Sequence, residues 1–181
     1  EKSMKPTQNL AEVTHLMSES RSQVMLALQH NPTSELSKLH DHPLTLHSDG
    51  LIANRDKITA LWERYMGMVD DPEEKKLADE FAVLRVQYVG EGLMPTREML
   101  LAGNYNNAQA TLLRTINPLF NRATTAATRL EEFLDREVVE RLEGNESRFQ
   151  HSVQSIVVGV AVLLLVVGVL AFWTVRSIIR P

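Results

Sequence analysis

The sequence predicts an all-α fold, an antiparallel up-down-up-down four-helix bundle whose fourth helix continues into a transmembrane helix. Three observations lead to this prediction. Four stretches within the first 155 residues place apolar side chains at helical spacing, no stretch alternates as a β-strand does, and the uncharged apolar run Ile156–Val175 lies near the C-terminus. Helices with one apolar stripe bury it best against one another, which favours a bundle.

The first predicted helix covers about Thr7 to Gln29, and the second covers about Asp49 to Met68. The stripe of the first helix consists of Leu10, Val13, Met17, Val24 and Leu28. The stripe of the second helix consists of Leu51, Ile58, Trp62 and Tyr65. Between them, the segment from His30 to Pro43 has a proline near each end, and we expect it to contain the longest connection of the bundle.

The third helix is predicted to begin at the run Asp70-Asp71-Pro72-Glu73-Glu74. Asp71 is placed as the N-cap, Pro72 as the first helical residue, and Glu74 can complete a capping box. The apolar positions of this helix are Leu77, Phe81, Leu84 and Tyr88.

Glycines and a proline interrupt the later part of the third helix. The residues expected to bend it are Gly90, Gly92 and Pro95. Gly103 and Asn104 are expected to end it after Leu101.

The fourth helix has the clearest pattern and is predicted to begin after Asn107. Its apolar residues alternate spacings of four and three, which forms a heptad seam. They are Leu112, Ile116, Leu119, Ala123, Ala126, Leu130 and Phe133. Pro118 is expected to kink the helix near its first turns. No strong helix breaker separates Arg129 from Ile156, so we expect this helix to run on into the membrane.

Residues 153–176 are predicted to form the transmembrane helix, because about twenty apolar residues span the roughly 30 Å of a bilayer core. A buried core helix is the alternative. Arg176 and Arg180 follow the run without an anion, so the positive-inside rule places this end in the cytoplasm and residues 1–152 outside the cell. Trp173 and Arg176 are expected to anchor the inner end. We also expect the chain to be part of a longer protein, with another transmembrane segment ahead of the first helix.

Composition excludes several classes of protein. The chain has no cysteine, which rules out a disulfide framework, a thiol nucleophile and a cysteine zinc site. Two of its 19 basic residues lie beyond residue 155, so the first 155 residues carry 17 basic against 23 acidic side chains, a net charge of −6. This balance argues against nucleic acid as a partner. No nucleophile elbow, paired-carboxylate site or zinc-protease motif is present, so we predict neither an enzyme nor a cofactor.

Several short motifs, taken in order, resemble the periplasmic four-helix-bundle sensor of bacterial methyl-accepting chemotaxis proteins. They are Leu61-Trp62-Glu63-Arg64-Tyr65, Asp71-Pro72, Phe81, Arg85, Tyr88, Leu100-Leu101-Ala102-Gly103 and the final Ile179-Arg180-Pro181. The resemblance covers nearly the whole chain. It implies that residues 177–181 begin a HAMP linker, the cytoplasmic coiled-coil relay of that family.

The resemblance also implies a ligand site. In the aspartate and serine receptors of this family, arginines on the first helix and polar groups near the start of the fourth grip an amino acid at a dimer interface. Arg21 matches the first of those arginines, whereas Leu26 and His30 replace the later two. The fourth-helix segment is Thr111-Leu112-Leu113-Arg114. This departure from the amino-acid pattern favours an organic acid, such as a dicarboxylate or tricarboxylate, over an amino acid as the small-molecule ligand of a homodimer.

The predicted ligand-binding residues are Arg21, Met25, His30, Thr111 and Arg114. Each also has a structural interpretation. Arg21 is equally compatible with a solvated or dimer-rim position, Met25 with the core, Thr111 with helix-start hydrogen bonding, and Arg114 with a place beside the heptad seam.

Histidines are concentrated in one part of the chain. Five of the six fall between His15 and His47, including His40-Asp41-His42. A metal site needs further ligands that converge in space, and alternating residues on a loop do not show such convergence. The sequence therefore predicts no metal site.

Together these observations predict a chemotaxis receptor of the bacterial inner membrane. A small ligand bound outside the cell would transmit a small helix displacement to cytoplasmic modules. Two alternatives remain: the input domain of a sensor histidine kinase or cyclic-dinucleotide enzyme, and a membrane-tethered helical scaffold that binds a protein partner.

Overall fold

The computed structural model describes residues 4–140, 142 and 168, and these residues contain no β-strand. The chain divides into two units, residues 1–135 and 136–181. The first unit is a four-helix bundle, so the predicted all-α four-helix bundle is confirmed. The predicted boundary at residue 152, the span 153–176 apart from residue 168, and the segment 177–181 lie outside the described residues, as do Trp173 and Arg176.

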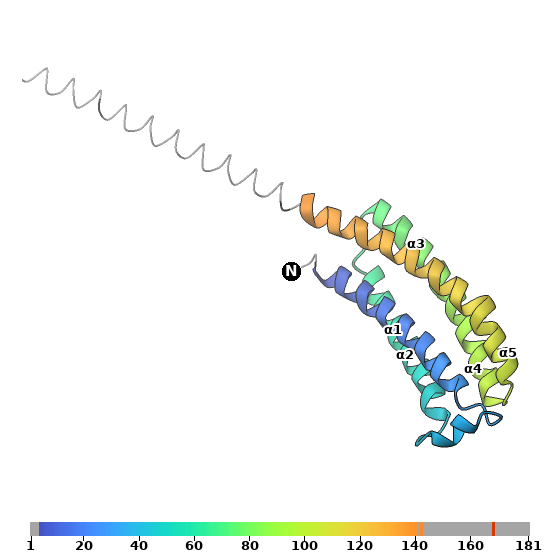
Figure 1. Cartoon of the computed structure of the whole chain (residues 1–181). Coiled ribbons are helices and arrows are strands. Elements are labelled where there is room, and N and C mark those ends of the chain that lie inside the picture. Colours follow the sequence, from blue (N-terminus) through green and yellow to red (C-terminus); the bar gives the residue numbers. More distant parts are fainter. Residues whose placement is uncertain (1–3, 141, 143–167, 169–181) are drawn as a thin grey trace, which may run out of the picture. The chain divides into compact units, whose positions relative to one another are not determined.

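The two N-terminal helices of the bundle are α1 (Met4–Leu28) and α2 (Thr45–Met66). They run side by side (Figure 1), and the connection between them contains a short 3₁₀-helix, η1 (Glu35–Leu39). The predicted helices therefore exist, and the second begins four residues earlier than expected, at Thr45. The connection is the longest between helices in the described part of the chain, as predicted.

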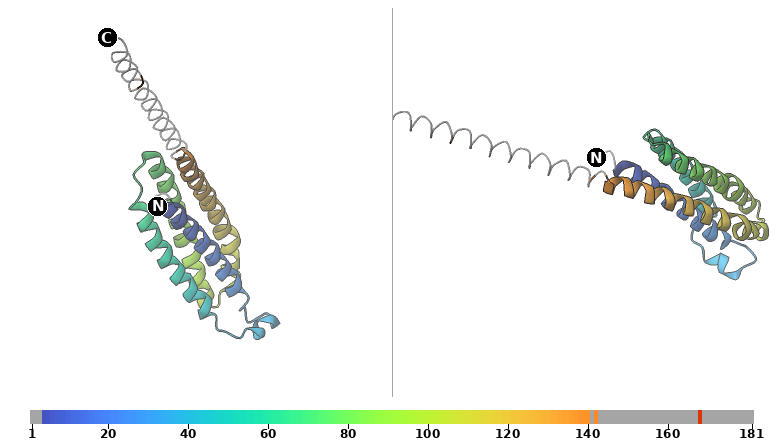
Figure 2. Two further views of the ribbon diagram at one scale, coloured as in Figure 1. Left: turned by 90° about the vertical axis from the view of Figure 1, so that its left-hand side faces the viewer. Right: turned by 90° about the horizontal axis from the view of Figure 1, so that it is seen from above.

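The third and fourth helices of the bundle each consist of several segments. The third comprises α3 (Pro72–Gln87), the π-helix η2 (Tyr88–Leu93) and α4 (Met94–Leu101). The fourth comprises α5 (Tyr105–Thr111), the π-helix η3 (Leu112–Ile116) and the helical residues 117–135. Both views in Figure 2 show the connection between α1 and α2 at the end of the bundle opposite the N-terminus.

The caps of α3 and α4 follow the sequence prediction. The Asp71 carboxylate accepts hydrogen bonds from the backbone N–H groups of Glu73, at 2.7 Å, and Glu74, at 3.0 Å. Gly103 ends α4 with a φ of 75°, a conformation that glycine adopts without a Cβ clash. The buried carboxylate of Glu74 accepts a hydrogen bond of 2.8 Å from the Tyr65 hydroxyl.

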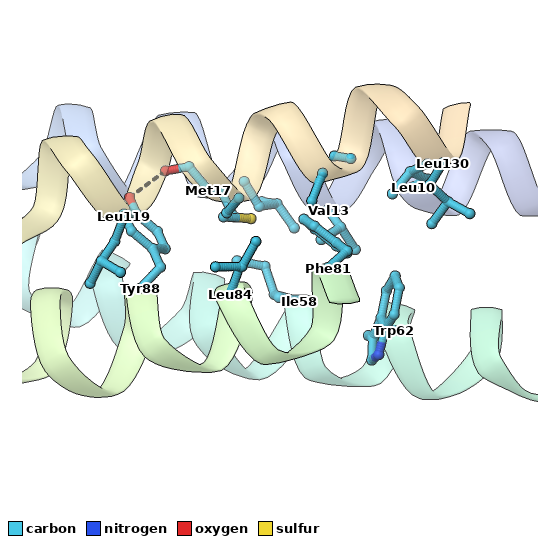
Figure 3. Packing of buried hydrophobic residues seen from close by; sticks show 14 of the residues in the cluster. Leu10, Val13, Met17, Ile58, Trp62, Phe81, Leu84, Tyr88, Leu119 and Leu130 are labelled. Atoms are coloured by element: carbon cyan, nitrogen blue, oxygen red, sulfur yellow. Dashed lines mark hydrogen bonds between the residues drawn. The ribbon is translucent and has the colours of Figure 1, made fainter. Parts of the chain in front are cut away.

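The four predicted apolar stripes form one hydrophobic core. All seven residues of the heptad seam, from Leu112 to Phe133, are buried. Leu28 and Leu77 are the two stripe residues that are only half-buried. Figure 3 shows how Val13 and Met17 of α1 lie over Ile58 of α2 and Phe81 of α3. Burial of these stripes supplies the main driving force for folding.

Just before Pro95 and Pro118, where the sequence predicts a bend and a kink, the helix forms a π turn. The Met94 N–H bonds to the carbonyl of Val89, and the Asn117 N–H bonds to the carbonyl of Leu112. A proline ring clashes with the carbonyl four residues earlier in an α-helix, and the wider π turn provides room for it. The structure thus places a π turn on each of the third and fourth helices.

No helix among the described residues is long and apolar enough to cross a membrane.

Candidate functional site

Arg21 lies on α1 and is half-buried against the fourth helix. Its guanidinium carbon is 4.7 Å from the centroid of the Phe120 ring, which is the geometry of a cation–π contact. Within the described part of the chain, Arg21 forms no ion pair with a carboxylate. The Arg21 side chain thus has an aromatic contact but no carboxylate partner among the described residues.

Phe120 in turn packs against a hydrogen-bonded tyrosine. The Phe120 and Tyr88 ring centroids are 5.8 Å apart. The Tyr88 hydroxyl donates a 2.8 Å hydrogen bond to the backbone carbonyl of Met17, the dashed line in Figure 3. Burial raises the pKa of Tyr88, so this hydroxyl stays protonated. These contacts connect Arg21 of the first helix with Phe120 of the fourth helix and, through Phe120, with Tyr88 of the third helix.

The other predicted ligand residues do not join Arg21. Thr111 donates a hydrogen bond of 2.9 Å to the carbonyl of Asn107 within its own helix. Met25 and Arg114 are exposed. No hydrogen bond, ion pair or ring contact of the described residues connects any two of the five predicted residues.

His30 belongs to a different constellation, a cluster of four histidines beside the connection between α1 and α2. This histidine cluster consists of His30, His40, His42 and His47. The rings of His30 and His40 stack with their centroids 3.8 Å apart. The ring centroid of His42 lies 5.1 Å from that of His30 and 5.0 Å from that of His47. One ring nitrogen each from His30, His40 and His42 lies within 4.8 Å of the other two.

Hydrogen bonds orient two rings of the histidine cluster. His42 Nδ1 is 2.8 Å from a carboxylate oxygen of Asp41, and His47 Nδ1 is 2.7 Å from the amide oxygen of Gln23. The Nε2 atoms of His42 and His47 are 3.0 Å apart. His30 Nε2 is buried and has no hydrogen-bond partner among the described residues.

The electrostatics of the cluster favour neutral rings at its buried edge. Burial, followed by the neighbouring histidines, lowers the pKa of His30 and of His47. The hydrogen bond from His42 lowers the pKa of Asp41. The cluster thus combines imidazole donors with one exposed carboxylate.

Two surface grooves accompany these features. One, with a volume of about 440 Å³, adjoins the histidine cluster and includes His40 and Leu28 in its lining. The other, of about 590 Å³, lies between α3 and the helical residues 121–129. Its lining includes Arg122 and the Gln87 side chain, whose buried oxygen has no partner within the described part of the chain.

Sequence reasoning missed the spatial convergence of the histidine cluster. The available signal was that His30 and His47 flank a single connection that contains His40 and His42. Two antiparallel neighbouring helices joined by one loop bring their adjoining ends together. Gln23 and Phe120 gave no sequence signal, because their partners come from other helices.

A family model described as "Tar ligand binding domain homologue" (TarH) matches residues 1–137. Searches of curated proteins and of solved structures gave no match.

Proposed function

Because the chain belongs to the Tar ligand-binding domain family, the four-helix-bundle sensors of chemoreceptors, we propose that it senses an organic acid carboxylate in chemotaxis. The domains of this family bind ligands and are not enzymes. The observation that carries the proposal is the Arg21 guanidinium, held on Phe120 and without a carboxylate partner in the described residues. A ligand carboxylate would supply that partner.

The chemistry at Arg21 suits a carboxylate ligand. A guanidinium presents parallel N–H groups that match the two oxygens of a carboxylate, and the resulting hydrogen bonds are charge-assisted. Its contact with Phe120 restricts the side chain before the ligand arrives, so less conformational entropy is lost on binding. Arg114, also without an ion pair within the described part of the chain, would hold a second carboxylate of a dicarboxylate or tricarboxylate, with Thr111 and Met25 beside it.

We propose that a homodimer completes the site. The five predicted residues are not connected within one copy, and large apolar side chains lie exposed next to two of them. Leu26, beside Met25, is 41% exposed, and Leu113, beside Arg114, is 60% exposed. Two-fold pairing would cover such side chains and bring Arg21 of one copy toward the fourth helix of the other. His30 takes part in the histidine cluster instead, where its ring stacks on His40.

Phe120 also offers a route for the signal. It lies on the helix that we expect to lead into the transmembrane segment 153–176, with the bundle in the periplasm and Pro181 in the cytoplasm. A ligand that pulls Arg21 would change its contact with Phe120 and favour a shift of that helix by about 1 to 2 Å. Moving Trp173, the proposed inner anchor with Arg176, by one position should then change signalling output while ligand affinity stays the same.

A thermal-shift panel on the full chain in detergent tests the ligand class. The panel contains citrate, malate and succinate as organic acids, and aspartate and serine as amino acids. One-site binding at 100 times the dissociation constant adds about 2.7 kcal/mol of stability, which raises the melting temperature by roughly 5 to 10 °C. A rise in melting temperature with an organic acid supports the proposal. A rise with amino acids alone contradicts it, and so does the absence of a rise with every compound of the panel.

A further inference from the structure

We propose that the histidine cluster, His30, His40, His42 and His47, is a binding site for a divalent transition-metal ion, with Zn²⁺ as the best-fitting cation. One nitrogen from each of three of these rings lies within 4.8 Å of the other two, and the fourth ring, His47, places its Nε2 3.0 Å from that of His42. The site is distinct from Arg21 and does not depend on the organic acid proposed above.

The hydrogen bonds of His42 and His47 determine where their protons lie. An ionised carboxylate and an amide oxygen only accept hydrogen bonds, so His42 donates from Nδ1 to Asp41 and His47 donates from Nδ1 to Gln23. In neutral rings, both Nε2 atoms then carry lone pairs. These two lone pairs face each other across 3.0 Å, an arrangement that a cation between them would stabilise.

The spacing of the nitrogens suits a metal ion. Zn²⁺ binds histidine nitrogen at about 2.0 to 2.1 Å in tetrahedral geometry, so two ligating nitrogens lie about 3.3 Å apart. The observed 3.0 Å between His42 and His47 is close to that separation. His30 contributes a buried Nε2 that has no hydrogen-bond partner among the described residues, and small rotations of its ring and that of His40 would complete the coordination.

The residues around the cluster match the usual surroundings of metal-binding histidines. Such histidines usually donate their second N–H to a carboxylate or carbonyl, which fixes the ring and raises its basicity. Asp41 and Gln23 occupy these positions. An all-imidazole donor set selects Zn²⁺, Cu²⁺ and Ni²⁺ over the hard cations Mg²⁺ and Ca²⁺, which prefer oxygen.

A bound ion would connect the ends of two neighbouring helices. His30 follows the end of α1, and His47 lies in the first turn of α2. His40, in the connection between them, borders the open groove through which an ion can enter. The metal would therefore hold the connection against both helices and stabilise the folded chain, as any ligand that binds only the folded state does.

Isothermal titration of Zn²⁺ into the full chain in detergent, free of any purification tag and stripped of metal with a chelator, tests the proposal. We expect one Zn²⁺ per chain and no binding of Mg²⁺. His42→Ala and His40→Ala should each weaken Zn²⁺ binding at least tenfold. Asp41→Asn, at an exposed residue that does not bind the ion itself, should weaken it about 10- to 100-fold.

His15→Ala is the matched control, because His15 is an exposed histidine of α1 outside the cluster and its loss should leave Zn²⁺ binding unchanged. Co²⁺ gives a second readout, since tetrahedral coordination produces a strong visible absorption that His42→Ala should abolish. Far-UV circular dichroism checks that each variant is folded. Absence of Zn²⁺ binding to the wild-type chain, or equal binding by the wild type, Asp41→Asn and His40→Ala, would overturn the proposal.

Discussion

Gly92 lies directly against Ile116, and this contact joins the two π turns of the bundle. A Cβ atom at position 92 would lie 3.1 Å from Cγ1 and 3.6 Å from Cα of Ile116. The Gly92 carbonyl accepts a buried hydrogen bond of 2.7 Å from Thr96. The third and fourth helices thus approach closely where each departs from α-helical hydrogen bonding, at η2 and η3.

Gly92→Val should destabilise the chain. The valine side chain would crowd the Ile116 side chain, whose Cγ1 lies 3.1 Å from the added Cβ, and overpacking of this kind costs about 1 to 3 kcal/mol. Gly90→Val is the matched control, because Gly90 lies in the same π turn with no atom near its Cβ position. Urea unfolding of the full chain followed by circular dichroism measures both. Equal stability of the two variants would show that the contact between the π turns is not tight.

Asp71→Ala should remove the N-cap of α3. The Asp71 carboxylate accepts hydrogen bonds from two otherwise unpaired N–H groups, and loss of such a cap costs roughly 0.5 to 2 kcal/mol. Asp71→Ser should recover most of this loss. Urea unfolding measures the stability of each variant. Asp70→Ala, which removes the same charge at an exposed neighbouring residue, is the control. If Asp70→Ala lowers the stability as much as Asp71→Ala does, the loss of stability comes from the charge alone and not from the cap.

Tyr65→Phe should destabilise the chain by about 1.5 to 3 kcal/mol, the range for hydrogen bonds to charged groups. The Tyr65 hydroxyl is a hydrogen-bond donor to the buried carboxylate of Glu74. The same unfolding measurement tests this expectation. A variant as stable as the wild type would mean that water replaces the hydroxyl as donor.

Stability should also fall at high pH. Burial, followed by the hydrogen bond to Glu74, raises the pKa of Tyr65, and burial raises that of Tyr88. Unfolded tyrosines lose their protons near pH 10, so above about pH 10 the unfolded state binds fewer protons than the folded state and the free energy of unfolding decreases. Urea unfolding between pH 8 and 11 should show this decrease in the wild type and a smaller one in Tyr65→Phe/Tyr88→Phe. Equal slopes would refute the assignment.

The helices could be predicted because burial leaves a periodic record in the sequence. Leu112, Ile116 and Leu119 are buried since one face of the fourth helix meets the core, and the spacing alone reveals that face. The π turns could not be predicted. Prolines marked their positions, but the hydrogen-bond register there also depends on the approach of Gly92 to Ile116 from another helix.

The sites were less predictable than the fold. The resemblance points to Arg21, but the contact of Arg21 with Phe120 depends on how two helices pack, which spacing does not specify. The sequence shows His40 and His42 close together in the chain. Their convergence with His30 and His47 depends on the path of the connection between α1 and α2, which the sequence pattern does not specify. Local patterns thus predicted elements and burial, and contacts between elements required the three-dimensional structure.

The affinity of the full chain for citrate and malate, measured by calorimetry before and after Arg21→Gln, tests the central claim most directly. Loss of a charge-assisted hydrogen bond should weaken binding roughly 10- to 100-fold. Arg64→Gln, at an exposed arginine in the last turn of α2, should bind as the wild type does. If Arg21→Gln instead binds both acids with wild-type affinity, Arg21 is not the carboxylate-binding group of this sensor.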